Sequence, residues 1–217
     1  MTTKKTKEER ITKMKTLEVK INFFEGILGT SPNNEDIYRD FIIERAKANG
    51  ADIDELSEQE EVDALPLDEE IEKGMTVFPR DEDGNPFLYD YQLKGYFKDT
   101  CSMLRKVKGT KSSGVKAFKK EIDGLVFPNP RQIVFQNAKL GVCQRPLRAS
   151  TAQGERVALA MSEEIAAGAY IVCEITCLID DQIDLIREWL DYGKLRGIGQ
   201  WRNSGKGRFT WEELRCY

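Results

Sequence analysis

One segment combines glycines, cations and an aromatic ring in a pattern that suits a sugar-phosphate chain. Between residues 193 and 208, five glycines are interleaved with five cations and Trp201. Backbone amides and positive side chains of such a loop can surround phosphates, and an indole can stack on a base. A structural glycine-rich hairpin, with Trp201 as its core anchor, would show the same composition. The candidate nucleic-acid-binding residues here are Lys194, Arg196, Gly197, Gly199, Trp201, Arg202, Lys206 and Arg208.

A second segment predicts a helix that begins with positive charge. Asp90 is expected to cap it, and Leu93, Phe97 and Cys101 follow at helical spacing. Lys94 then lies in the first turns, where free N–H groups favour a phosphate, and Gly95 permits close approach of a backbone. An ordinary amphipathic helix with solvated lysines would give the same pattern. The candidate residues here are Lys94, Gly95, Lys98 and Arg105.

The net charge of -4 over 217 residues hides blocks of opposite sign. Residues 35–73 hold fifteen acidic residues against four basic ones. Residues 94–120 hold nine basic residues against Asp99 alone. The acidic average therefore does not argue against a polyanionic partner.

The absence of histidine excludes several kinds of chemistry. It removes the commonest general base, the commonest metal ligand and every Ser-His or Cys-His nucleophile pair. The five cysteines form no C-x-x-C pair, which favours free thiols in a reducing cytosol over a zinc site. Any catalysis would therefore rest on carboxylates, Lys, Tyr, Cys or a borrowed metal. We expect no metal, no cofactor and no catalytic residue.

The apolar periodicity predicts the main elements of the fold. Residues 17–23 and 169–179 alternate as strands, and the runs that follow Asp90 and Asp181 have helical spacing. Shorter strands are expected over 132–137, 139–143 and 207–211, and residues 145–163 stay unassigned. The order is that of an α+β, ferredoxin-like (RRM-like) βαββαβ domain over 1–217, with a large acidic helical insertion at 30–74 after strand 1. Such a sheet leaves one face free of helices, and RNA-recognition domains bind RNA there.

No apolar run is long enough to span a bilayer, and residues 1–15 lack the apolar stretch of a signal peptide. We therefore expect a cytoplasmic protein without a membrane partner.

Three motifs in this order resemble the RAMP superfamily of CRISPR-associated proteins, most closely its RNA-binding backbone subunits. The first strand ends at Gly26 and Gly29, Asp83–Pro86 precedes the Leu93-Lys94-Gly95 helix start, and a Gly- and Arg-rich segment leads into the last strand. The serine pair expected before Leu93 is replaced by Tyr91-Gln92.

The resemblance implies a non-catalytic protein that grips guide or single-stranded RNA and contacts protein subunits of a CRISPR-type complex. It leaves open a homo-oligomer along the RNA. One alternative is a viral or mobile-element anti-defence protein that docks on such a complex or mimics it. Another is a metal-dependent RNA endonuclease that uses an aspartate after strand 1, Asp36 or Asp40, although both suit a solvated helix face better.

Overall fold

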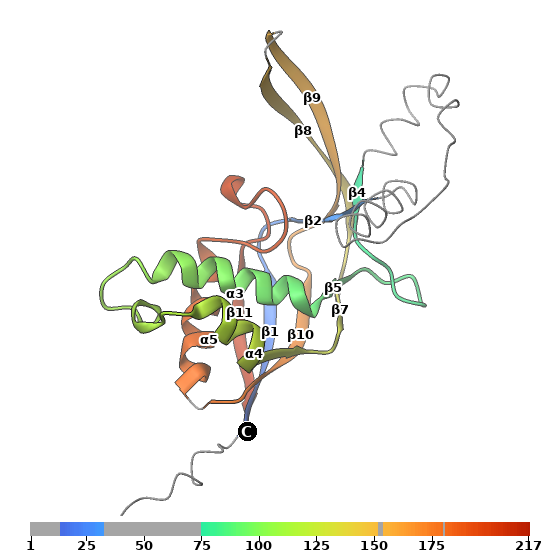
Figure 1. Cartoon of the computed structure of the whole chain (residues 1–217). Coiled ribbons are helices and arrows are strands. Elements are labelled where there is room, and N and C mark those ends of the chain that lie inside the picture. The colour runs from blue at the N-terminus through green and yellow to red at the C-terminus, as the bar shows by residue number, and fades with distance from the viewer. Residues whose placement is uncertain (1–13, 33–74, 152–153, 180) are drawn as a thin grey trace, which may run out of the picture. The chain divides into compact units, whose positions relative to one another are not determined.

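A computed structural model describes residues 14–32, 75–151, 154–179 and 181–217 (Figure 1). These residues divide into two compact units. The first contains residues 14–27, Pro79–Lys139 and Ile165–Tyr217, and the second contains residues 28–32, 75–78 and Leu140–Glu164. Every candidate binding residue lies in the first unit. Most of the expected acidic insertion, with Asp36 and Asp40, lies outside the described residues.

A four-stranded antiparallel sheet forms the centre of the first unit. Its strands are β1 (Lys15–Phe23), β6 (Val126–Asn129), β10 (Tyr170–Cys177) and β11 (Phe209–Cys216), in the order β11-β1-β10-β6. Alternate residues of β1 and β10 are buried on one face, with Val19 opposite Cys173 and Ile21 opposite Ile171. All five cysteines are free, and burial raises the pKa of Cys173 and Cys177 to about 12.

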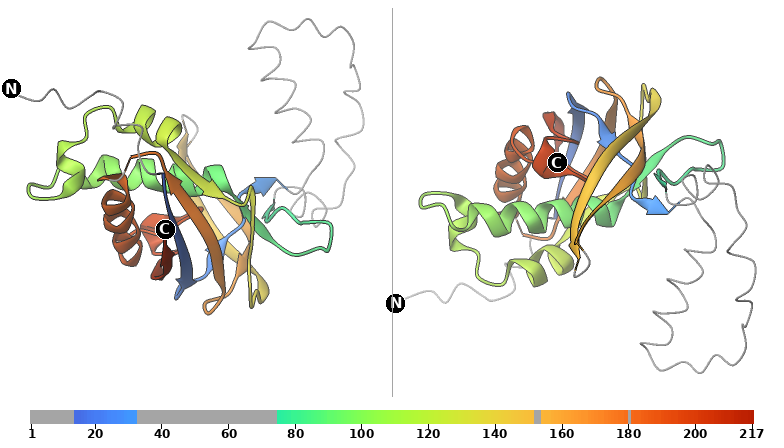
Figure 2. Two further views of the ribbon diagram at one scale, coloured as in Figure 1. Left: turned by 90° about the horizontal axis from the view of Figure 1, so that it is seen from below. Right: turned by 90° about the horizontal axis from the view of Figure 1, so that it is seen from above.

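Three helices belong to this unit: α3 (Asp90–Leu104), α4 (Phe118–Leu125) and α5 (Asp181–Asp191). The long α3 runs across the strands (Figures 1 and 2). Its Tyr96 ring lies 5.3 Å from the Phe209 ring of β11, and the Tyr96 hydroxyl donates to the Trp189 carbonyl of α5 at 2.7 Å. Tyr89, rather than the predicted Asp90, precedes the first turn as N-cap, and its N–H donates to the Gln92 side chain.

The α+β class is confirmed, but the strand beside β10 differs from the prediction. The sequence places it at residues 132–137, yet β7 (Gln132–Val134) pairs with β5 (Phe87–Tyr89) in a separate two-stranded sheet. The place beside β10 belongs to β6, where Pro128 lies opposite Ile175. Proline is tolerated on an edge strand because the outer edge needs no N–H donor, and its presence conceals β6 in the sequence.

The second unit is built from strands. The consecutive strands β8 (Leu140–Thr151) and β9 (Gly154–Ile165) pair as a long ribbon, which covers the segment that the sequence leaves unassigned (Figure 1). The short strands β2 (Ile27–Leu28), β3 (Ser31–Pro32) and β4 (Thr76–Val77) complete the sheet. None of the helices that the structure describes has the length and hydropathy of a membrane span.

Candidate nucleic-acid interface

The Gly/Arg-rich segment forms a closing loop, residues 193–208, that leads into β11. Two parts of its backbone cross at close range, where the Ile198 N–H donates to the Gly207 carbonyl at 3.0 Å. A Cβ on Gly207 would lie 2.0 Å from the Ile198 oxygen, and one on Gly197 would lie 2.2 Å from the Lys206 oxygen. Only glycine fits either position, so the closing loop is held at this crossing.

The closing loop also meets the glycine turn after β1, so the structure brings two of the sequence motifs together. The Gly207 N–H donates to the Gly26 carbonyl at 2.8 Å. Arg208 donates to Glu25 at 3.0 Å, and its guanidinium lies 5.5 Å from the centre of the Phe24 ring. Arg208 therefore fastens the loop to the turn.

Arg196 and Arg202 share one carboxylate, that of Asp99 on α3. Arg196 donates to it through Nε, and Arg202 donates through a terminal nitrogen at 2.9 Å. All three side chains are about three-quarters buried, and the bond to Asp99 raises the pKa of Arg196. Two guanidiniums against one carboxylate leave a net positive charge. Asp99 was missed as a site residue, although it is the one acid within the basic tract.

Asp99→Asn is expected to lower the free energy of unfolding by about 1–3 kcal/mol, because two partly buried guanidiniums lose their counter-charge. Urea unfolding followed by circular dichroism measures the loss. Asp123→Asn is the control, since that carboxylate is 56% exposed and has Lys98 as its ion-pair partner. Its loss is expected to stay below about 1 kcal/mol. Equal losses in both variants would contradict the role given to Asp99.

Trp201 keeps part of its indole accessible. Its backbone is left-handed, with φ 53°, and 40% of the residue is exposed. Gly199 also has a positive φ, of 89°. Lys194 is exposed and Lys206 is half-buried. The loop thus leaves part of an aromatic residue accessible at the position before Arg202.

The candidates on α3 form a second group. Lys94 donates to the Asp123 carbonyl at 3.3 Å and lies over the Phe127 ring, and Lys98 pairs with the Asp123 carboxylate at 2.5 Å. Lys94 thus contacts α4 and β6, Lys98 contacts α4, and Asp99 contacts the closing loop. Gly95 has open space around it. Arg105 lies just beyond the last residue of α3.

The helix-free face of the four-stranded sheet carries mixed charge. Glu18 and Glu174 lie opposite each other in register, Arg215 pairs with Glu18 at 3.3 Å, and Lys20 lies over the Tyr170 ring. A hollow of about 330 Å³ on this face is lined by Glu18, Asn129, Pro130, Val172, Cys173 and Glu174. Glu18 is paired with Arg215, and Glu174 accepts a hydrogen bond from the Tyr217 hydroxyl at 2.8 Å. This face therefore carries charges of both signs, and RNA binding there, as in RNA-recognition domains, stays a prediction.

These elements define an α+β fold with a four-stranded antiparallel sheet at its centre. The chain resembles one from a structure described as the type III-B Cmr-beta bound to cognate target RNA, with a TM-score of 0.52 and 13% sequence identity. The match covers 94% of this chain and 60% of that chain, so this chain spans about three-fifths of its length. No family model and no curated protein matches the sequence.

Proposed function

We propose that this chain is an RNA-binding, RAMP-like protein that grips guide or single-stranded RNA and acts by binding rather than by catalysis. The observation that carries the proposal is the closing loop, in which Arg196 and Arg202 share Asp99 beside a partly exposed Trp201. The likeness to a chain from an RNA-bound complex supports it. By the same likeness, we infer protein subunits of a CRISPR-type complex as further partners.

We also propose that the first unit is a ferredoxin-like βαββαβ domain. The strand order β11-β1-β10-β6, with α3 before β6 and α5 before β11, supports this proposal. We infer one RAMP-like domain over 1–217, with residues 30–74 inserted after the first strand. The twelve predicted binding residues all come from its helical side and its closing loop.

The chemistry of binding follows from these side chains. Each phosphate that a cation neutralises releases counterions, so the affinity falls steeply as salt rises. A base stacked on Trp201 adds about 1–3 kcal/mol without sequence preference. Phosphate contacts position the strand but do not read its sequence. We therefore expect strong salt dependence and weak sequence specificity.

Fluorescence anisotropy of a labelled oligouridylate, titrated with the full chain at several salt concentrations, tests this function. Arg202→Gln is expected to reduce the slope of log affinity against log salt by about 0.7, the value for one single-strand phosphate contact. Arg187→Gln is the matched control, because Arg187 pairs with Glu213 and Asp184 on another part of the unit. No binding at low salt would overturn the proposed function. A normal slope for Arg202→Gln would remove Arg202 from the site.

A further inference from the structure

The connection between α3 and α4, together with the first residues of α4, carries a dense positive charge. Residues 105–120, named here the basic connection, contain seven basic residues and no acidic one. Arg105 alone was among the predicted binding residues. The seven are Arg105, Lys106, Lys108, Lys111, Lys116, Lys119 and Lys120.

The carboxylate of Glu188 on α5 makes three hydrogen bonds to the basic connection. Glu188 accepts hydrogen bonds from the Lys111 N–H at 2.6 Å, from the Ser112 N–H at 3.0 Å and from the Ser112 hydroxyl at 2.5 Å. The buried Trp189 indole donates to the same hydroxyl at 2.9 Å. These bonds hold the short 3-10 helix Lys111–Gly114 in place. The lysines on both sides of it therefore project from a backbone that is already ordered.

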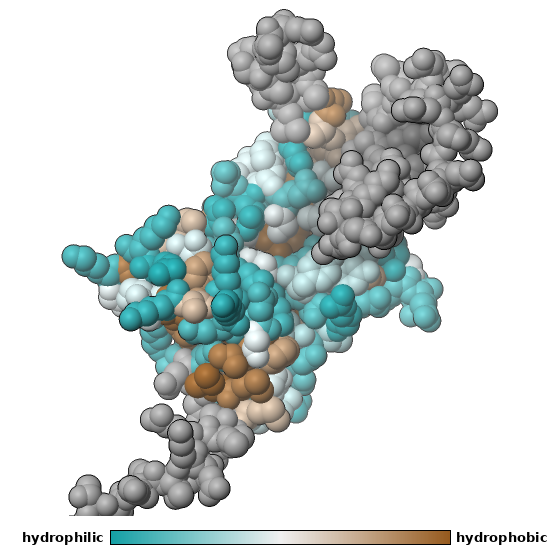
Figure 3. Space-filling model, in the orientation of Figure 1, coloured by the Kyte–Doolittle hydropathy of each residue, from teal (hydrophilic) through white to brown (hydrophobic). Residues whose placement is uncertain are grey.

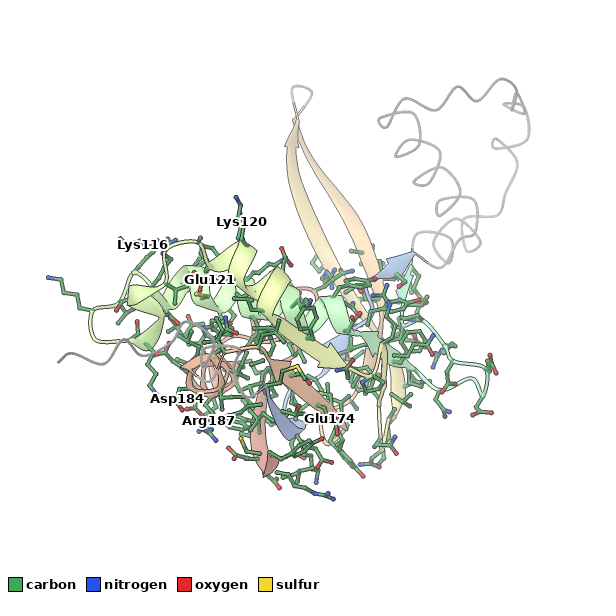
Figure 4. The ribbon with its side chains drawn as sticks, turned by 60° about the horizontal axis from the view of Figure 1, so that its bottom comes forward. Lys116, Lys120, Glu121, Glu174, Asp184 and Arg187 are labelled. Atoms are coloured by element: carbon green, nitrogen blue, oxygen red, sulfur yellow. The ribbon has the colours of Figure 1, made fainter. Side chains whose placement is uncertain are left out.

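The positive side chains of the basic connection face water. All seven residues are exposed, and an ion pair to a described residue is seen only for Lys111, with Asp184. Figure 4 shows Lys120 extending away from the body of the unit, with Lys116 on the same side. The surface around α3 in Figure 3 is mostly hydrophilic. Solvated lysines that are close together along the chain can neutralise successive phosphates of a nucleic acid.

We propose that the basic connection binds the phosphate backbone of RNA, as a second contact surface apart from the closing loop. This rests on the proposed function and extends it to residues outside the predicted set. The surface suits RNA better than an acidic protein, because Val107 is its one large exposed apolar side chain. Protein interfaces need an apolar core and are depleted in lysine.

The test compares two double variants of the full chain in the oligouridylate titration. Lys116→Gln with Lys120→Gln is expected to lower affinity about tenfold and to reduce the salt slope by about 1.4, equal to two phosphate contacts. Lys139→Gln with Arg215→Gln removes the same charge from exposed positions elsewhere in the unit and is expected to leave the slope unchanged. Thermal unfolding shows whether each variant remains folded.

The outcomes separate the two proposals. If the wild-type chain fails to bind oligouridylate at low salt, the proposed function falls, and this inference falls with it. If the wild type binds and both double variants behave alike, only the basic connection is overturned. Polyglutamate of matched charge serves as competitor. If it displaces the RNA as well as unlabelled oligouridylate does, the surface takes acidic polymers in general and the assignment to RNA is wrong.

Discussion

Gly207→Ala is expected to lower the free energy of unfolding by at least about 3 kcal/mol. Gly207 has φ 70°, and an added Cβ would lie 2.0 Å from a backbone oxygen that cannot move without opening the loop crossing. The change also displaces the hydrogen bond to Gly26. RNA affinity should fall with stability, because Arg202 and Arg208 lose their positions. Urea unfolding and the oligouridylate titration measure the two effects.

Gly95→Ala is the matched control for this prediction. Gly95 lies within α3, its Cβ would meet no atom within 4 Å, and alanine is the better helix former. We expect the free energy of unfolding of this variant to rise by up to about 1 kcal/mol. The same substitution thus has opposite effects at the two positions. A stable Gly207→Ala variant would show that the closing loop tolerates another path.

Glu188→Ala is expected to lower the free energy of unfolding by about 3 kcal/mol, because three donors of the basic connection lose a charged acceptor. The Lys111–Gly114 helix then loses its anchor, so the RNA salt slope should fall as it does in the lysine double variant. Urea unfolding and anisotropy test the two effects. A stability loss without any change in slope would separate the anchor from RNA binding.

Asp184→Ala serves as the control for Glu188→Ala, one turn earlier on α5. Hydrogen bonds from Lys111 and Arg187 lower the pKa of Asp184, so its contribution is present at neutral pH and is lost as pH falls. Because Asp184 is half exposed, solvent screens the pair. We expect Asp184→Ala to have a smaller effect than Glu188→Ala at neutral pH.

The sequence predicted those parts of the fold that have a clear hydrophobic period. Leu17 to Phe23 and Ile171 to Cys177 alternate over a whole strand, and both strands were found. β6 escaped because Pro128 occupies one of its four positions and Pro130 follows it. The strand predicted over 139–143 matches the start of β8. The rest of the β8–β9 ribbon was not predicted, because the stretch from Arg145 to Glu163 mixes polar, charged and small residues without a period.

The candidate site could be predicted only as a set of cations. Composition shows where positive charge is dense, but the acids that hold it come from distant parts of the chain. Asp99 and Arg196 are 97 residues apart, and Glu25 and Arg208 are 183 apart. Local sequence therefore could not distinguish the arginines of the closing loop, which are paired with acids, from the solvated lysines of the basic connection.

The sheet order also has a consequence for how the molecule is made. Leu17 of β1 pairs with Ile175 and with Cys216, so the earliest strand lies between two late ones. In a chain synthesised from its N-terminus, β1 has neither neighbouring strand to pair with until β10 and β11 have appeared. Such distant pairings are slow to close, and they expose the chain to aggregation meanwhile. We therefore expect the refolding rate to limit recovery of the protein more than its final stability does.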